Sequence, residues 1–258
     1  MVQGVKIFRD YFRDYTGQYV FIGGTACDVI LGKLGEDFRI TKDLDIVLLA
    51  EALDESFIEK FMSFIQEGGY SHYDKGKGKE QFYRFSNPKD NRFPKMIGLF
   101  SRTPEYLDSK LSRLGPIHIS DEVISLSAIL LDDEYYELLK QGIVVYEDVS
   151  VLDMKQIILF KMKAWLDLSS RKAAGEQIDS KNIKKHKNDV LRLAAYLDIN
   201  DFLDISGQIK VDAAEFISKL EEDIVDPRDL RLTDVSYEEL LARIKKCYNI
   251  DGIHDESR

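Results

Sequence analysis

The chain has 258 residues and a formal net charge of -10 at pH 7. Its length allows one large or two modest domains, and its apolar fraction of 44% suits a globular protein with a core of its own. The negative charge excludes a surface covered with Lys and Arg for nonspecific nucleic-acid binding. No apolar run approaches the length needed to span a bilayer, so no membrane partner is expected.

The sequence contains two cysteines, Cys27 and Cys247, and they lack the spacing of metal ligands. Two reduced thiols are therefore expected, as in a cytosolic protein. Residues 1–15 alternate aromatic and charged side chains and have no apolar stretch like that of a secretory signal. We expect a cytoplasmic location.

The first part of the chain mixes helices with short strands. Phe8, Tyr11, Phe12 and Tyr15 recur at helical spacing, which predicts a first helix with one aromatic face that packs into the core. A buried strand is predicted at 19–22, and a helix follows its terminal glycine pair. Further strands are predicted at 43–49, 71–74, 81–85 and 95–100, and a helix at 55–66.

From residue 153 onward, long helical patterns dominate the sequence. We therefore expect an α+β protein, in which a mixed sheet flanked by helices occupies 1–150 and a helical domain occupies 151–258. The predicted helices of the second domain are 154–168, 180–197, 212–220 and 237–247.

Two carboxylates stand on one face of the predicted strand 43–49. Side chains alternate across a strand, so Asp43 and Asp45 point to the same side while Leu44 and Ile46 are buried on the other. Paired carboxylates suit hard divalent cations, which keep water and substrate phosphates as their remaining ligands. Taken alone, the pattern favours an ordinary edge strand with one wet face.

A second motif precedes this strand. The strand 19–22 ends in Gly23-Gly24-Thr25, which opens the next helix. Glycines let the backbone approach a phosphate closely, and a helix N-terminus offers free N–H groups. Thr25 is expected to cap the helix, to bond a phosphate oxygen, or to do both. A glycine turn of this kind followed by an Asp-x-Asp strand predicts a nucleotide-phosphate site.

These two motifs resemble those of a known family. The runs Phe21-Ile-Gly-Gly-Thr-Ala-Cys-Asp and Arg39-Ile-Thr-Lys-Asp-Leu-Asp-Ile-Val are similar to the signature of the DNA polymerase β-like nucleotidyltransferase superfamily. More narrowly, the chain resembles the AbiEii/AbiGii-type nucleotidyltransferase toxins of bacterial toxin–antitoxin and phage-defence systems. The resemblance extends from about residue 19 to 197.

The resemblance implies roles for particular residues. Asp43 and Asp45 would bind Mg²⁺ or Mn²⁺, and Gly23, Gly24 and Thr25 would cradle the triphosphate of an NTP. The same resemblance implies that Arg39 and Lys161 offset the charge of the nucleotide, and that Asp189 belongs to a late Lys/Asp motif that contributes to nucleotide binding. Asp43, Asp45 and Lys161 are then the expected catalytic residues.

The helical positions of the late residues fit either of two interpretations. Lys161 lies within the apolar arc of the helix 154–168, where a lysine is expected to face a nucleotide phosphate or to pair with a structural acid. Asp189 borders the apolar face of the helix 180–197, and a solvated helix with mixed charges explains that segment equally well.

One position departs from the resemblance. Members of the family carry a third acid on a later strand, and strand alternation places Gly98 at that position here. The third acid helps to bind the catalytic metal and to take the proton from the attacking hydroxyl. Asp74 or Glu80 would have to substitute for it.

The expected function is transfer of a nucleoside monophosphate from an NTP to an acceptor. The resemblance implies an RNA (tRNA) or protein acceptor and a cognate antitoxin partner. Because of Gly98, a catalytically silent nucleotide- or partner-binding protein of the same fold is the alternative. A small-molecule nucleotidyltransferase of the antibiotic-modifying kind shares the same platform and stays open.

Two lysine-rich segments could bind phosphate or RNA, or could simply be solvent-exposed surface. The turn 75–79 alternates lysine with glycine, which suits either a phosphate or a solvated hairpin loop. For an RNA acceptor, the obvious basic cluster lies on the helix 180–197. It comprises Lys181, Lys184, Lys185, Lys187 and Arg192.

Overall fold

The computed structural model describes residues 2–36, 38, 41, 43–49, 51–70, 72–75, 82–102, 115–116 and 121–250. The chain divides into two units. The sheet unit comprises Met1–Leu131 and Leu139–Ile157, and the helical unit comprises Asp132–Leu138 and Ile158–Arg258. A mixed sheet flanked by helices and a helical remainder are the α+β organisation predicted from the sequence.

The division differs in detail from the predicted ranges. The strand β8 (Val149–Leu152) lies across the predicted boundary at residue 150 and belongs whole to the sheet unit. Conversely, the first part of the helix α6 (Asp133–Gln141) belongs to the helical unit.

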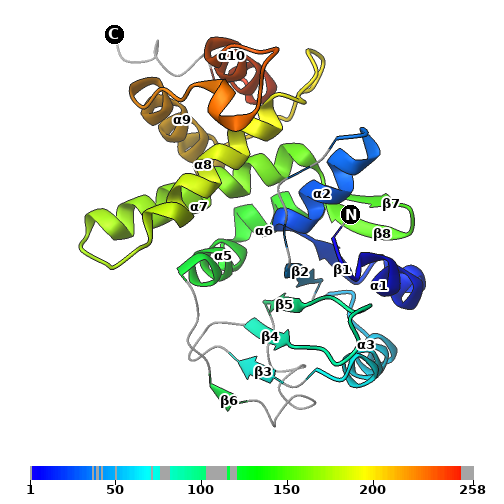
Figure 1. Ribbon diagram of the computed structural model, residues 1–258. Coiled ribbons are helices and arrows are strands. Elements are labelled where there is room, and N and C mark those ends of the chain that lie inside the picture. Colours follow the sequence, from blue (N-terminus) through cyan, green and yellow to red (C-terminus); the bar gives the residue numbers. More distant parts are fainter. Residues whose placement is uncertain are drawn as a thin grey trace. The chain divides into compact units, whose positions relative to one another are not determined.

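The sheet unit is built on one mixed sheet, drawn in Figure 1. Its described strands lie in the order β6-β3-β4-β5-β2-β1-β8-β7. The pair β2 and β5 is parallel, whereas β1 with β2 and β4 with β5 are antiparallel. The strands other than β8 are β1 (Tyr19–Phe21), β2 (Asp43–Leu48), β3 (His72–Lys75), β4 (Phe82–Ser86), β5 (Met96–Ser101), β6 (Gly115–Pro116) and β7 (Ile143–Tyr146).

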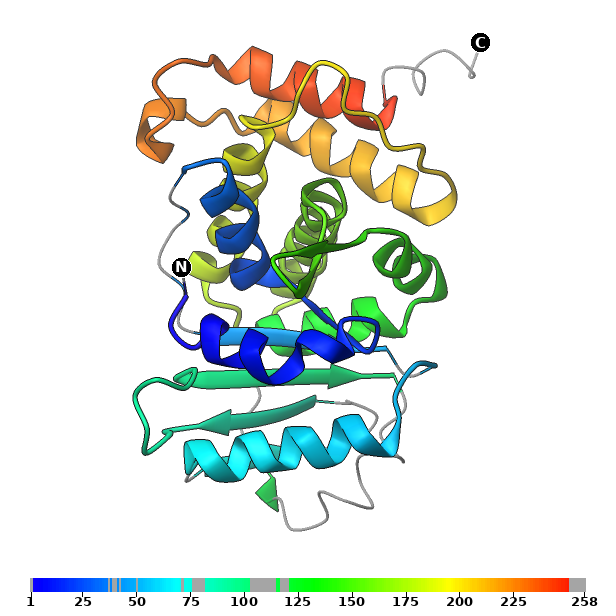
Figure 2. The same ribbon diagram turned by 90° about the vertical axis from the view of Figure 1, so that its right-hand side faces the viewer.

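An aromatic core covers one face of this sheet. The helices α1 (Val5–Phe12) and α3 (Glu55–Gly68) lie against that face, in front of the strands in Figure 2. Phe8 stacks on Phe12 with ring centroids 4.3 Å apart and meets Phe64 edge-on at 5.5 Å. This confirms the predicted aromatic face of the first helix, which ends in a short 3₁₀ turn (Arg13–Tyr15).

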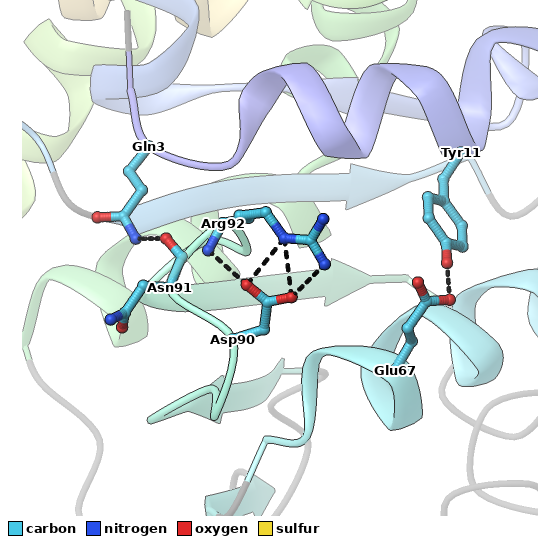
Figure 3. Close-up of polar contacts among 6 residues, drawn as sticks. All are labelled: Gln3, Tyr11, Glu67, Asp90, Asn91 and Arg92. Carbon is cyan, nitrogen blue, oxygen red and sulfur yellow. Dashed lines mark hydrogen bonds and ion pairs between the residues drawn. The ribbon is translucent and has the colours of Figure 1, made fainter.

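The loop between β4 and β5 is tied to the first helical segment. Gln3 donates a side-chain hydrogen bond to the Asn91 carbonyl, and Tyr11 donates one to Glu67, as Figure 3 shows. Within the loop, the Arg92 guanidinium contacts the Asp90 carboxylate at 2.6 Å. Hydrogen bonds from Arg92 hold the pKa of Asp90 below its ordinary value. The Gln3 bond thus ties this loop to the start of the chain, whereas the Tyr11–Glu67 bond joins α1 to α3.

The helical unit contains the predicted long helices with shifted ends. They are α7 (Met154–Ala173), which begins in the sheet unit, α8 (Ser180–Ala194), α9 (Gly207–Glu222) and α10 (Tyr237–Tyr248), with a 3₁₀ turn at Pro227–Leu230. Apolar residues such as Ile158, Val190, Phe216 and Ile244 are buried. Among the helices described, none combines the length and apolar character needed to cross a membrane.

Some elements differ from the prediction for identifiable reasons. The helices α5 (Asp121–Leu131) and α6 were not predicted. The helix α9 begins at Gly207 rather than at Asp212, because the Glu134 carboxylate accepts the N–H of Gln208 at 2.8 Å. This cap comes from a residue 74 positions earlier in the chain, so no local sequence pattern predicts it.

Candidate functional site

The acidic strand β2 presents alternating faces. Asp43 and Asp45 are partly exposed, whereas Leu44 and Ile46 are buried. The two aspartates therefore lie on the same face of the sheet, about 7 Å apart along the strand. This face is opposite the aromatic core, because Phe21 pairs with Ile46 and packs against Phe8 with ring centroids 5.1 Å apart.

The glycine turn lies directly against this acidic strand. Gly23 has φ +61° and is the first residue of α2 (Gly23–Lys33). A Cβ at this position would stand 3.0 Å from Oδ2 of Asp45. The backbone is fixed here as well, since Ile22 donates its N–H to the Asp45 carbonyl at 3.0 Å. A residue with a side chain would thus be strained in φ and would meet the carboxylate.

The second glycine packs against Thr41. A Cβ at Gly24 would lie 3.0 Å from both Cβ and Oγ1 of Thr41. Thr41 precedes the acidic strand and lies within the Arg39-Ile-Thr-Lys-Asp run, and it was not predicted as a site residue. Its place within that run was the sequence signal that could have identified it. The structure thus brings together Gly23, Gly24 and Asp45 and adds Thr41 to them.

Thr25 has a different role from the predicted helix cap. Its hydroxyl donates to the Asp43 carbonyl at 2.7 Å, and its side chain is fully buried. The N-cap residue of α2 is Ile22, and no side-chain cap bond is present there. The prediction that Thr25 caps the helix is therefore wrong. Its hydroxyl instead ties the start of α2 to the backbone of β2.

The start of α2 offers backbone donors beside the acids. The first backbone bond of the helix runs from the Ala26 N–H to the Ile22 carbonyl at 3.3 Å. The N–H groups of Gly23, Gly24 and Thr25 precede that bond, so helix geometry provides no intrahelical partner for them. A helix N-terminus with such donors attracts anions, and here it adjoins a carboxylate suited to a divalent cation.

The register across the sheet defines the third-acid position. Gly98 of β5 pairs with Asp45 of β2 on one side and with Arg84 of β4 on the other. Residue 98 therefore lies on the acidic face, as predicted, and it has no side chain. Arg84 in turn pairs with Asp74 of β3. The backbone of Asp74 is therefore three strand spacings from that of Asp45, about 14 Å.

The described part of the chain contains no group of three His, Cys, Asp or Glu residues placed to hold a metal ion. This agrees with glycine at position 98 beside the Asp43 and Asp45 pair. Three predicted features lie outside the described residues, so their structure is not described. These are Arg39, most of the turn 75–79, and Glu80.

Lys161 and Asp189 form a buried ion pair in the helical unit. Nζ of Lys161 lies 2.8 Å from Oδ2 of Asp189, and the two side chains are 6% and 0% exposed. Arg192 also approaches the Asp189 carboxylate, at 3.6 Å. Pairing with an acid was one of the two interpretations of Lys161, and the structure shows that pairing. A role for either residue toward a nucleotide stays a prediction.

The predicted basic cluster on α8 is partly neutralised by ion pairs. Lys187 is buried and bonds the Asp223 carboxylate, and Arg192 approaches Asp189. Lys181 and Lys184 are exposed. The cationic surface available to an RNA is therefore smaller than the sequence indicates.

A further buried polar network in the helical unit was not predicted. Asp212 accepts a hydrogen bond from the Tyr135 hydroxyl at 2.8 Å and pairs with Lys163 at 2.7 Å. Burial, followed by the charge of Asp212, raises the pKa of Tyr135. These residues come from α6, α7 and α9, so the network links three helices of this unit.

Comparisons with known proteins add little to this site. No protein-family model matches the sequence, and no curated protein matches it either. Among solved structures, the chain is similar to an antigenic nucleotidyltransferase-like protein from Paracoccidioides brasiliensis, with 13% identity and a TM-score of 0.43. That similarity covers 89% of this chain and 91% of the other. Values this low assign no family to the chain.

Proposed function

We propose that this protein is a divalent-metal-dependent nucleotidyltransferase. The observation that carries the proposal is the contact between the glycine turn and the acidic strand. A Cβ at Gly23 would lie 3.0 Å from Oδ2 of Asp45. A carboxylate suited to a metal ion therefore lies next to the N–H donors of a helix N-terminus. A metal–triphosphate complex needs both features at once.

The residues present fit a magnesium ion that is completed by its substrate. Asp43 and Asp45 provide two carboxylates on one face, and Mg²⁺ is commonly held by one or two carboxylates together with water and substrate phosphates. Mn²⁺ suits the same oxygen ligands. The chemistry that such an ion supplies when bound is polarisation of the attacked phosphorus and charge neutralisation on the leaving pyrophosphate.

The protein's own groups bind and orient the nucleotide in this proposal. The N–H groups of Gly23, Gly24 and Thr25 bind phosphate oxygens, and the Thr25 hydroxyl holds the turn on β2. The oxygen of the acceptor hydroxyl bonds to the α-phosphorus and its proton passes to water, while the bond from the α-phosphorus to the bridging oxygen breaks to release pyrophosphate. The sequence resemblance further proposes Arg39, Lys161 and Asp189 as residues that contribute to nucleotide binding.

The acceptor and partner are proposed from the sequence resemblance. The AbiEii/AbiGii-type motifs favour an RNA (tRNA) or protein hydroxyl as acceptor and a cognate antitoxin as partner. For RNA, the exposed Lys181 and Lys184 on α8 are the proposed contacts. This part of the proposal is independent of the nucleotide site itself.

One observation favours a second candidate function. Gly98 occupies the third-acid position in register with Asp45. No carboxylate at that position takes the proton from an attacking hydroxyl, which favours a catalytically silent protein that binds nucleotide or a partner. Such a protein would bind Mg–NTP without releasing pyrophosphate.

The test is transfer of label from each α-labelled NTP, with Mg²⁺ or Mn²⁺, to total RNA and protein. We expect labelled acceptor with the wild type and none with Asp45→Asn. Asp10→Asn is the matched control, because Asp10 is an exposed acid of the sheet unit paired with Arg9. Metal-dependent NTP binding without transfer would support the silent protein instead. Absence of metal-dependent NTP binding would refute the nucleotidyltransferase and the nucleotide-binding form of the silent protein.

A further inference from the structure

Arg84 lies in the same transverse row of the sheet as Asp45. Gly98 pairs with both residues, one on each neighbouring strand. Residues paired across adjacent strands project to the same face. Arg84 and Asp45 therefore project to one face with two strand spacings, about 10 Å, between their Cα atoms.

The neighbours of Arg84 along β4 confirm which face this is. Tyr83 and Phe85 are fully buried, whereas Arg84 is partly exposed. Phe85 contacts Phe61 of α3 in the aromatic core, with ring centroids 5.6 Å apart. Alternation then directs Arg84 away from that core and toward the acidic face.

Gly98 removes the side chain that would otherwise separate the two charged residues. The flanking residues of β5 on this face, Met96 and Phe100, both carry large side chains. A glycine within a strand frequently marks a place where a ligand approaches the backbone closely. Glycine at position 98 thus leaves no side chain of β5 in the row between Asp45 and Arg84.

We propose that Arg84 binds the triphosphate of the nucleotide from the far side of Gly98. This inference rests on the proposed function and adds a residue to its site. A guanidinium forms paired, charge-assisted hydrogen bonds with phosphate oxygens. Asp45 would hold the cation that accompanies the triphosphate, and Arg84 would neutralise phosphate charge that the cation leaves uncovered.

A structural role for Arg84 is the competing explanation. Arg84 lies within β4 between two paired strands, where a partly exposed side chain contributes to the stability of the sheet. The two roles predict different binding behaviour. A structural role would lower the affinities for an NTP and for its NMP by the same factor, whereas contact with the β- and γ-phosphates affects mainly the NTP.

The experiment measures binding of each NTP and the corresponding NMP, with Mg²⁺, to the full-length protein. For Arg84→Ala we expect the Kd of the bound NTP to rise about tenfold or more, as for loss of a charged hydrogen-bond partner, with little change for the NMP. Arg84→Lys should restore part of the NTP affinity. Arg92→Ala is the matched control, since Arg92 is exposed and pairs with Asp90.

The outcomes separate this inference from the proposed function. If the wild type binds NTP, Asp45→Asn weakens binding and Arg84→Ala does not, only the role of Arg84 is refuted. Equal losses of NTP and NMP affinity in Arg84→Ala also refute it. If the wild type binds no NTP with Mg²⁺, the proposed function and this inference both fail.

Discussion

At Gly23, backbone conformation and site geometry impose the same requirement. Its φ of +61° favours glycine, and a Cβ would meet Asp45 at 3.0 Å. We predict that Gly23→Ala lowers the free energy of unfolding by about 1 kcal/mol, the cost of a left-handed residue, and lowers NTP affinity at least tenfold. Chemical denaturation and NTP titration measure the two effects.

Gly35→Ala is the matched control for this prediction. Gly35 also has a positive φ, +78°, but nothing lies within 4 Å of its Cβ position. It should lose similar stability and keep its nucleotide affinity. Equal loss of affinity in both variants would contradict a role for the Gly23 turn in the site.

A second prediction at the residue scale concerns the contribution of the Lys161–Asp189 ion pair to stability. Both side chains are nearly inaccessible to solvent, and removing one partner of a buried pair costs about 3–5 kcal/mol. We expect Lys161→Met to lose stability in that range, measured by urea denaturation. Lys219→Met removes an exposed pair with Glu215 and should cost less than about 0.5 kcal/mol.

A double variant separates the structural and nucleotide roles of this pair. Replacing both partners by apolar residues restores much of the stability in comparable cases, so Lys161→Met with Asp189→Leu should refold well. If Lys161 also binds nucleotide, transfer activity stays lost. Recovery of activity along with stability would leave the pair a purely structural role.

At the scale of elements, α10 is defined by a complete capping box. The Glu239 N–H donates to Oγ of Ser236 at 3.1 Å, and the Ser236 N–H donates to Oε2 of Glu239 at 2.7 Å. A Ser-x-x-Glu motif at the start of a helix is recognisable from the sequence. We predict that Ser236→Ala lowers the stability by about 1 kcal/mol, measured by denaturant unfolding.

The same cap predicts a pH dependence. Hydrogen bonds from the backbone and side chain of Ser236 lower the pKa of Glu239 from its ordinary value of 4.5. A lowered folded-state pKa gives a stabilisation that is present above pH 4.5 and is lost as the pH falls through the folded-state pKa. Glu239→Gln should therefore show a shallower loss of stability on acidification, and an unchanged pH profile would contradict the prediction.

Strand register is the element-scale property on which the site depends. The sequence indicated that residue 98 faces the acids, and the β2–β5 pairing confirms it. The pairing of Gly98 with Arg84 is different, because the loop that joins β4 to β5 is held from outside the two strands, by the Gln3 side chain bonded to the Asn91 carbonyl. No local periodicity reports which residues of two strands stand opposite each other.

For the whole molecule, the division into two units leads to a prediction about fragments. β8 lies between β1 and β7 in the sheet, so a fragment of residues 1–157 keeps every described strand. A fragment of residues 1–146 leaves β7 without its partner and exposes an edge of β1. We expect the shorter fragment to aggregate on size exclusion and the longer one to stay monomeric and folded by circular dichroism. Equal behaviour of both would contradict this role for β8.

The sequence by itself determined the α+β class, the glycine turn, the acidic strand and most helices. These features are local, since hydrophobic periodicity, strand alternation and glycine placement act over a few residues. The sequence also identified Lys161 as a lysine within an apolar arc, which requires a partner.

The tertiary structure decided which distant groups meet. It brought the Gly24 backbone against Thr41, paired Lys161 with Asp189, supplied Glu134 as the cap of α9, and aligned Arg84 with Gly98. Each contact joins residues that are distant in sequence, and its free energy depends on packing and register rather than on local preference. For that reason the chemical residue types were recognisable from the sequence, whereas their partners were visible only in the fold.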